Sequence, residues 1–283
     1  MFRIRIQNKK KCIWYCSAVV SFLLFLLLLG WTNHLANTQD AQQMAGRWSE
    51  KKDVAQISCF FSSKAEVTED TIQSFEYSLK NVLQEASITE TSENPSARLW
   101  VDAYSADGKI TLVNGKNTLD ANAIGIGGDF FMFHPLKLIT GAYFSGNDLM
   151  QDYCIIDQDA AWQLFGSNDV VGMTVYIGNV PHIVTGVVQR PDSRMDKAAG
   201  LNSTVVYVSY ETLSAYGTNN GINHYEIVMP NPVDEFAYGK VKEGIGIDEK
   251  NVEIVENSRR YSLPNRIKTI LAFGTRSMNG KAI

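Results

Sequence analysis

Hydrophobic and polar positions divide this chain into two unequal parts. Residues 13–30 read IWYCSAVVSFLLFLLLLG and carry no charge. A run of this length is about what an α-helix needs to cross the hydrocarbon core of a bilayer. Trp14, Tyr15 and Trp31 lie near its two ends, where amphipathic aromatic rings prefer the membrane interface. We therefore predict a transmembrane helix over residues 13–31.

The charges ahead of this run predict its orientation. They are the five basic side chains of Arg3, Arg5, Lys9, Lys10 and Lys11. The positive-inside bias keeps residues 1–12 in the cytoplasm as a basic tip that favours anionic lipid heads, and it places the rest of the chain outside. The alternative is a cleaved secretory signal, but the run exceeds the usual apolar core of about 7 to 15 residues. Both interpretations place the main domain outside the cytosol.

Residues 32–52 are polar, rich in helix-forming residues and free of proline. This composition predicts a stalk helix that continues the transmembrane helix, with a flexible linker as the alternative. Beyond the stalk, residues 54–62 have the apolar content of a strand. Thr68 then caps a helix whose apolar side chains recur at helical spacing. They are Ile72, Phe75, Leu79, Val82 and Leu83.

The remaining pattern predicts an α+β fold built from both ends of the chain. Residues 98–104 and 109–113 are predicted strands, and Asp107-Gly108 between them is a strong hairpin signal. Towards the C-terminus, strands are predicted over residues 223–229 and 252–255, with a helix between them. The matching order of strand, helix and strand at each end favours a single α+β layer. Residues 119–206 would then be an insertion that forms a second, mostly β lobe.

A series of local signals over residues 121–188 is the most specific feature of the sequence. An aromatic pair after glycine leads into a glycine-containing loop, a strand, a short helix and two further strands. The signals in order are Gly128-Asp129-Phe130-Phe131, Gly141, Phe144, Asp148, the strand 153–157, Ala161-Trp162-Gln163-Leu164-Phe165-Gly166, Val171-Gly172, Gly178-Asn179 and Gly186-Val187-Val188. Residues 205–212, VVYVSYET, follow. The series resembles the MacB-like periplasmic core domain of bacterial ABC transporter permeases of the FtsX and MacB type.

The resemblance covers the first span and an external domain over residues 53–262, and it implies a porter-like α+β lobe with residues 119–206 as the inserted lobe. It implies a non-enzymatic permease component that acts in mechanotransmission or in contacting a substrate or partner. Its partners would be a separate ABC ATPase subunit and other permease chains, and dimerisation is expected only by analogy. Residues 263–283 would be a truncated descending stalk, since no second span follows. The alternative function is a stand-alone, membrane-anchored binding module without transport activity.

Composition agrees with a folded domain outside the cytosol. Hydrophobic residues make up 45% of the chain and charged residues 20%, which suits a globular protein. Removing the five positive charges of residues 1–11 from the net charge of −4 leaves −9, which argues against nucleic-acid binding. Cys59 and Cys154 are the only cysteines after the span. Both lie in predicted strands, so we predict buried free thiols, although an extracytoplasmic disulfide would be permitted.

No catalytic, cofactor or metal site is predicted. The chain has no Gly-x-x-x-x-Gly-Lys-Ser/Thr loop, and Phe130 replaces the third glycine of a dinucleotide fingerprint that begins at Gly125. Ser49 and Lys52 match the Ser-x-x-Lys motif of penicillin-recognising enzymes but lack its partner motifs. The histidines have no helical zinc spacing, so we expect each to be structural. They are His34, His134, His182 and His224.

Two remaining groups of residues have alternative interpretations. Asp157 and Asp159 resemble the start of a calcium loop, but Trp162 stands where its glycine is needed, so helix capping is favoured. The second group is an aromatic cluster that could form a partner surface, with the core of the inserted lobe as the alternative. Its members are Phe130, Phe131, Phe133, Tyr143 and Phe144.

Overall fold

The computed structural model describes residues 9–37, 40–49, 53–89, 98–190 and 203–260. These residues belong to two units, one containing the N-terminal helix and the other spanning Ala41–Arg260. The start of the predicted cytoplasmic tip and the predicted descending stalk over residues 263–283 lie outside the described residues.

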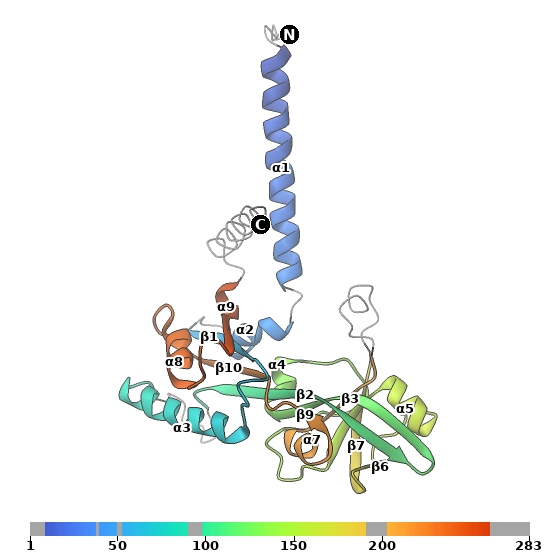
Figure 1. Ribbon diagram of the computed structural model, residues 1–283. Coiled ribbons are helices and arrows are strands. Elements are labelled where there is room, and N and C mark those ends of the chain that lie inside the picture. The colour runs from blue at the N-terminus through green and yellow to red at the C-terminus, as the bar shows by residue number, and fades with distance from the viewer. Residues whose placement is uncertain (1–8, 38–39, 50–52, 90–97, 191–202, 261–283) are drawn as a thin grey trace, which may run out of the picture. The chain divides into compact units, whose positions relative to one another are not determined.

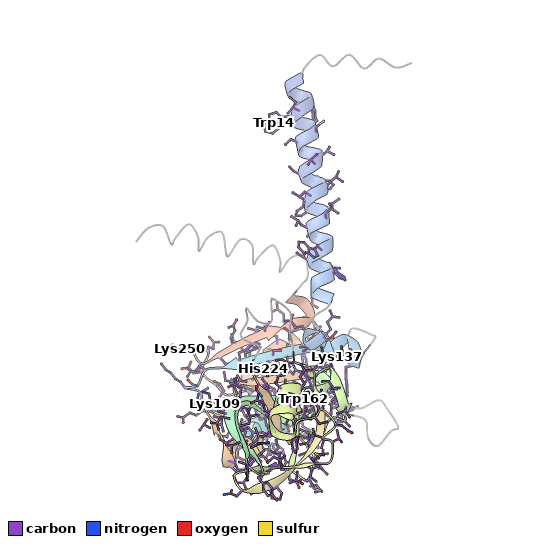
Figure 2. The ribbon with its side chains drawn as sticks, turned by 90° about the vertical axis from the view of Figure 1, so that its right-hand side faces the viewer. Trp14, Lys109, Lys137, Trp162, His224 and Lys250 are labelled. Carbon is purple, nitrogen blue, oxygen red and sulfur yellow. The ribbon has the colours of Figure 1, made fainter. Side chains whose placement is uncertain are left out.

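The N-terminal unit is the helix α1 (Lys9–Asn37), which contains the predicted span. Its segment Ile13–His34 is long and apolar enough to cross a membrane, and none of that stretch is buried inside protein. Side chains such as that of Trp14 project outward from the helix (Figure 2). Exposed apolar side chains over this length suit a lipid environment. The apolar run therefore forms a candidate transmembrane helix, as predicted.

The segment after the span departs from the predicted stalk. The helix α1 continues only to Asn37, and two short helices follow, η1 (Asp40–Gln42) and α2 (Met44–Trp48). The buried side chain of Met44 joins an apolar cluster of the second unit, and its N–H donates to Gln56 Oε1 at 2.9 Å. Burial of this apolar residue holds α2 against the sheet, so one continuous helix over residues 32–52 is not what forms.

The second unit is an α+β domain around one mixed, mostly antiparallel sheet, which confirms the predicted fold class. The strands pair in the order β11-β1-β10-β2-β3-β8-β5-β7-β4, with β6 and β9 attached to β2. The pairs β3–β8 and β5–β7 are parallel. The strands are β1 (Val54–Phe61), β2 (Val101–Asn114), β3 (Asn117–Gly128), β4 (Leu138–Gly141), β5 (Tyr153–Asp157), β6 (Thr174–Ile177), β7 (Val180–Val188), β8 (Val205–Ser209), β9 (Thr218–Asn219), β10 (His224–Pro230) and β11 (Val252–Glu256).

The predicted hairpin at Asp107-Gly108 is wrong, because β2 runs straight through both residues. A Cβ at Gly108 would lie 2.3 Å from the carbonyl oxygen of Thr218, so this glycine permits close approach of β9 and does not make a turn. The turn lies further along, where Asn114 pairs with Asn117 around a two-residue loop. Gly115 takes a φ of +61° there, which other residues adopt only with strain. The two loop residues are Gly115 and Lys116, and a glycine in the first position of a two-residue loop is itself a hairpin signal.

Helices cover the sheet at both ends of the long β2–β3 hairpin (Figure 1). Towards one end lie α3 (Glu69–Glu85) and α8 (Phe236–Gly244), and towards the other lie α5 (Gln158–Phe165) and α7 (Tyr210–Tyr216). The predicted stripe on α3 is buried except at Val82, which is partly exposed. Two further short helices, α4 (Phe130–Phe133) and α9 (Asn257–Arg260), complete the elements of this unit.

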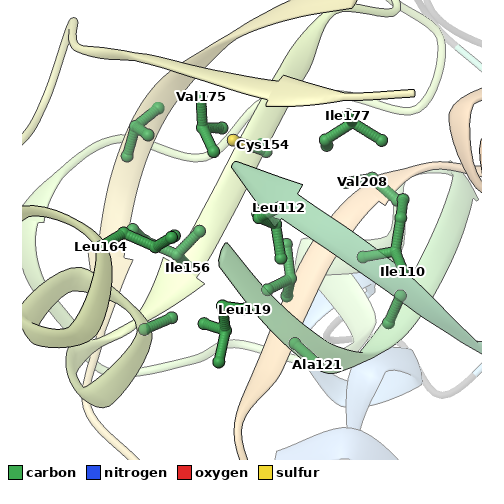
Figure 3. Close-up of a cluster of buried hydrophobic side chains, with 14 of the residues drawn as sticks. Ile110, Leu112, Leu119, Ala121, Cys154, Ile156, Leu164, Val175, Ile177 and Val208 are labelled. Atoms are coloured by element: carbon green, nitrogen blue, oxygen red, sulfur yellow. The ribbon is translucent and has the colours of Figure 1, made fainter. Parts of the chain in front are cut away.

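The apolar core has separate clusters beneath these two sets of helices. One cluster packs α3 and α8 on β1 and β10 and includes Cys59. Another packs α5 and α7 on β2, β3, β5, β7 and β8, and it includes Cys154 together with Leu112, Ile156 and Val175 (Figure 3). Both thiols are buried and free, as predicted. Burial raises the pKa of Cys154 to about 12 and raises that of Cys59 further, so neither forms a thiolate readily.

Candidate functional site

The strand β10 and the end of α4 bring together two histidines and a glutamate. His224 and Glu226 lie two residues apart on β10, so their side chains point to the same face of the sheet. His134 is the residue that ends α4, which follows directly after β3. The three side chains, here called the His–His–Glu cluster, thus come from segments far apart in the sequence. Figure 2 marks the position of His224.

The contacts within the His–His–Glu cluster are short. His134 Nε2 lies 2.6 Å from Glu226 Oε2, and His224 Nε2 lies 3.8 Å from Glu226 Oε1. One donor atom from each of the three residues lies within 4.8 Å of the others. Aromatic rings fix both imidazoles, since His224 stacks on Phe60 and His134 packs against Phe130, each at 4.7 Å between ring centroids. The two imidazoles are therefore positioned by aromatic packing as well as by their contacts with Glu226.

A shell of polar side chains from β1 and α9 supports the carboxylate. Ser58 Oγ donates to Glu226 Oε1 at 2.6 Å, and Asn257 Nδ2 donates to Ser58 Oγ at 2.7 Å. Gln56 Nε2 lies 3.5 Å from the same carboxylate oxygen and donates more strongly to the carbonyl of Ala41 at 2.6 Å. These contacts orient the carboxylate by occupying Oε1, so Oε2 is the oxygen that faces His134.

Burial and charge set the protonation of the cluster. Burial lowers the pKa of His224, despite the opposing charge of Glu226, and so favours its neutral imidazole. Burial alone would raise the pKa of Glu226, but the hydrogen bond and charge of His134 outweigh it, and the pKa falls below its usual value. The arrangement is an ionised carboxylate facing a neutral imidazole. Imidazole nitrogen and carboxylate oxygen are also donors that zinc uses in proteins.

The sequence analysis predicted no metal site and interpreted His134 and His224 as structural. The pattern His224-x-Glu226 in a strand was the available signal, because alternate residues share one face of a sheet. His134 could not be added from spacing, since only the tertiary fold brings α4 to β10. His182 is buried, with Nδ1 3.0 Å from the carbonyl of Val180 and Nε2 3.1 Å from Thr212 Oγ1. His182 therefore has a structural role that fills both ring nitrogens.

The five aromatic residues of the predicted cluster lie together at α4 and the loop after β4. The four phenylalanines are buried in an apolar cluster that also includes Val101 and Val228. Tyr143 is 36% exposed and stacks on Phe131 with 4.6 Å between ring centroids. Its hydroxyl also donates to the carbonyl of Leu136. Most of this aromatic surface is thus internal, and Tyr143 is the member that reaches solvent.

The two aspartates at the start of α5 act on the helix and on one arginine. Asp157 Oδ1 accepts from the N–H of Ala160 at 2.7 Å, which is the predicted capping contact. Asp157 Oδ2 accepts from Arg190 at 2.9 Å and from the N–H of Val205 at 3.1 Å. Asp159 lies 2.5 Å from another nitrogen of Arg190. This pair therefore closes a corner between β5, β7 and β8.

A cavity of about 670 Å³ lies beside this corner. Apolar side chains such as Leu136 and Tyr207 form part of its wall, and the basic Lys137 and Arg190 are balanced there by the acidic Asp107 and Asp157. A concave site that combines apolar and polar side chains can hold a small ligand. The Ser-x-x-Lys motif has no such setting: Ser49 Oγ donates to Asp53 at 2.7 Å, and residues 50–52 lie outside the described part of the chain.

Comparison with known proteins gives a consistent match. The model of the MacB-like periplasmic core domain matches residues 21–254. The macrolide export ATP-binding/permease protein MacB of Chromobacterium violaceum is 32% identical over 99 residues, or 34% of this chain and 15% of the relative. The same-named protein of Pasteurella multocida is 30% identical over 98 residues, or 34% of this chain and 14% of the relative. Each match spans less than a fifth of the relative's length.

Two solved structures resemble this one. The periplasmic region of MacB from Actinobacillus actinomycetemcomitans has a TM-score of 0.46 and 20% identity, and the match covers 77% of this chain and 92% of that one. The extracellular domain of the transporter YknZ from Gram-positive bacteria has a TM-score of 0.43 and 18% identity, over 71% and 99% of the two chains.

Proposed function

This chain belongs to the family of the MacB-like periplasmic core domain, and on that basis we propose that it is the membrane-anchored, extracytoplasmic part of an ABC transporter permease. The family match carries the proposal, because it runs from within the candidate transmembrane helix through the whole sheet domain to β11. The proposed role is non-catalytic: the domain transmits motion from the membrane helices or contacts a substrate or partner.

The β2–β3 hairpin supports a mechanical role. Its two strands pair without interruption from Asn114–Asn117 at the turn to Ala103–Gly128 at the other end. Along its length β2 also borders β10 near one end and β6 near the other. A displacement at one end of such a hydrogen-bonded ladder moves the other end, because each strand residue is fixed to its neighbours. The hairpin therefore offers a stiff connection between the two parts of the core.

Co-purification tests the transporter proposal. The full chain, carrying a C-terminal affinity tag, would be purified in detergent from membranes of its own host, with an unrelated tagged single-pass protein as the control. We expect an ABC ATPase and further permease chains to be captured only by this chain. The absence of an ATPase from the captured material, and of ATPase and permease reading frames beside the gene, would contradict the proposal.

Cysteine labelling tests the proposed orientation. Lys250 and Lys109 are exposed on the sheet domain (Figure 2). Cys59 and Cys154 of the same domain are buried. A membrane-impermeant maleimide should label Lys250→Cys and Lys109→Cys in intact spheroplasts and leave the natural chain unlabelled. Labelling of the two variants only after lysis would place the domain in the cytoplasm and overturn the orientation.

The cavity near Arg190 favours a second candidate, a stand-alone binding module that takes a small ligand. Its wall combines apolar side chains with two basic residues, Lys137 and Arg190, and two acidic ones, Asp107 and Asp157, so a largely apolar ligand without a strong net charge is the class that fits. The substitution Leu136→Arg would fill the cavity. In a binding module this change abolishes ligand-induced thermal stabilisation, whereas in a permease component it leaves ATPase capture intact.

A further inference from the structure

We propose that His134, His224 and Glu226 form a binding site for a divalent transition metal ion, with zinc as the ion that the donors suit best. Two imidazole nitrogens and one carboxylate oxygen form a donor set found in zinc sites, with a fourth position for water. Magnesium and calcium prefer oxygen donors, so this set discriminates against them. Membership of the permease family does not require such a site, so the inference goes beyond the proposed function.

The spacing of the donor atoms suits coordination. Zinc bonds of about 2.0 to 2.2 Å place tetrahedral ligand atoms roughly 3.4 Å apart. His134 Nε2 and Glu226 Oε2 are closer than this, at 2.6 Å, and one donor atom from each of the three residues lies within 4.8 Å of the others. Side-chain shifts of about an ångström would therefore bring the donors close to tetrahedral spacing.

An unsatisfied nitrogen points to a missing ligand. Nε2 of His224 is buried and makes no hydrogen bond with any described residue. Buried polar atoms without a partner are uncommon in native proteins, because they lose hydration without compensation. The nearest carboxylate oxygen of Glu226 is too distant for a hydrogen bond at 3.8 Å. A metal ion bound to Nε2 would supply the partner that the chain itself does not provide.

The surroundings suit a metal centre in two further respects. Ser58 donates to Glu226 Oε1 and is itself fixed by Asn257, which is the kind of support that orients a coordinating carboxylate. The side chains of His134 and His224 are 25% and 19% exposed, so an ion can enter and water can take the remaining position. The site is thus firmly supported on the Glu226 side and open on the histidine side.

A bound ion would connect two parts of the sheet domain. His134 comes from the end of α4, whereas His224 and Glu226 come from β10, far along the chain. Coordination across this junction closes a long loop in the chain and reduces the freedom of the two parts to move apart. If the domain transmits motion, metal binding would make the connection between α4 and β10 more rigid.

Metal titration of the full chain tests the site. The protein would be purified in detergent with a tag that contains no histidine, stripped with a chelator, and titrated with Co²⁺ as an optical probe and then with Zn²⁺. We expect one Zn²⁺ per chain, visible Co²⁺ absorption bands that Zn²⁺ abolishes, and a higher thermal midpoint with Zn²⁺. Affinity should fall by roughly 100-fold or more in His224→Ala.

The controls separate metal binding from a simple ion pair between His134 and Glu226. His182→Ala removes a buried histidine whose two nitrogens are already occupied, and it should retain wild-type zinc affinity. His134→Ala alters the more exposed ligand, so it decides the question if His224→Ala fails to fold. Absence of stoichiometric Zn²⁺ in the wild type, or wild-type affinity in a folded His134→Ala protein, would overturn the proposal and leave an ion pair only.

Discussion

Asp157 and Glu226 are both buried carboxylates in the same sheet domain, yet their surroundings differ. Asp157 accepts from the N–H of Ala160, from the N–H of Val205 and from Arg190, so both of its oxygens are occupied by the chain's own donors. Glu226 has one oxygen held by Ser58 and the other 2.6 Å from His134 Nε2, while the neighbouring buried Nε2 of His224 has no hydrogen-bond partner among the described residues. The chain therefore supplies every hydrogen-bond partner that Asp157 needs, but it leaves the surroundings of Glu226 with an unpartnered atom.

This difference separates a structural acid from a candidate binding acid. A buried charge is tolerated when hydrogen bonds and an opposite charge replace the lost hydration. At Asp157 the chain provides this replacement, so the residue contributes to stability. At Glu226 part of the replacement comes from two imidazoles, one of which has an unpartnered nitrogen. Burial alone therefore does not identify a functional carboxylate, whereas an unsatisfied neighbour does.

The largest expected effect comes from removing Asp157, together with the hydrogen bonds that its two oxygens accept. Asp157→Ala should lower the free energy of unfolding by about 3 kcal/mol, because it removes the cap of α5 and leaves the partly buried guanidinium of Arg190 with only Asp159 as an acidic partner. Chemical denaturation followed by tryptophan fluorescence measures the loss. The control Asp159→Ala removes a partly exposed acid and should cost less than about 1 kcal/mol. Equal losses in the two variants would contradict the assignment of Asp157 as the structural centre.

Glu226→Gln should have a smaller effect without added metal, a loss of about 2 kcal/mol at pH 7. The amide oxygen still accepts from Ser58, so the main loss is the short contact between the carboxylate and His134 Nε2. Denaturation in the presence of a chelator gives this value, and repetition with Zn²⁺ should widen the gap from the wild type. A loss larger than that of Asp157→Ala would reverse the contrast between the two sites.

The sequence predicted the elements whose signals are local and failed where the signal depends on distant segments. The stripe on α3 and the cap of α5 by Asp157 follow from spacing within one helix, and both are present. The hairpin was misplaced because Gly108 provides room for β9, a contact that only the tertiary fold creates. The His–His–Glu cluster was missed for the same reason, since α4 and β10 meet only in the folded chain.

A third carboxyl group, partly buried, extends the comparison to a site where acidic groups lie close together. Glu76 on α3 lies near Asp102, and Tyr225 donates its hydroxyl hydrogen to Asp102 at 3.2 Å. Burial, together with the charge and hydrogen bond of Asp102, raises the pKa of Glu76 to about 8. Because the folded-state pKa lies above the unfolded value, the protonated form is favoured by folding. The stabilisation that protonated Glu76 contributes is fully present below about pH 4.5 and is lost as the pH rises through about 8.

Glu76→Gln should therefore change the pH dependence of stability. The glutamine cannot ionise, so at pH 9 the variant should be more stable than the wild type by about 1 kcal/mol, after allowance for solvent screening of this partly exposed group. At pH 4.5 the two proteins should unfold at nearly the same denaturant concentration. If the free energy of unfolding changed with pH in the same way for the wild type and the variant between pH 5 and 9, Glu76 would not titrate in this range.

The smallest expected effect is at Trp162, which lies on the same helix that Asp157 caps but is 58% exposed. Trp162→Ser should change the free energy of unfolding by less than about 0.5 kcal/mol, because little apolar surface is uncovered. Leu164→Ala, on the buried face of α5, should cost about 3 kcal/mol through the cavity it leaves. If Trp162 contacts a partner, the serine variant should capture less ATPase or permease while unfolding normally. A stability loss close to that of Leu164→Ala would instead make Trp162 part of the fold, and α5 would then depend on more than its cap and its buried face.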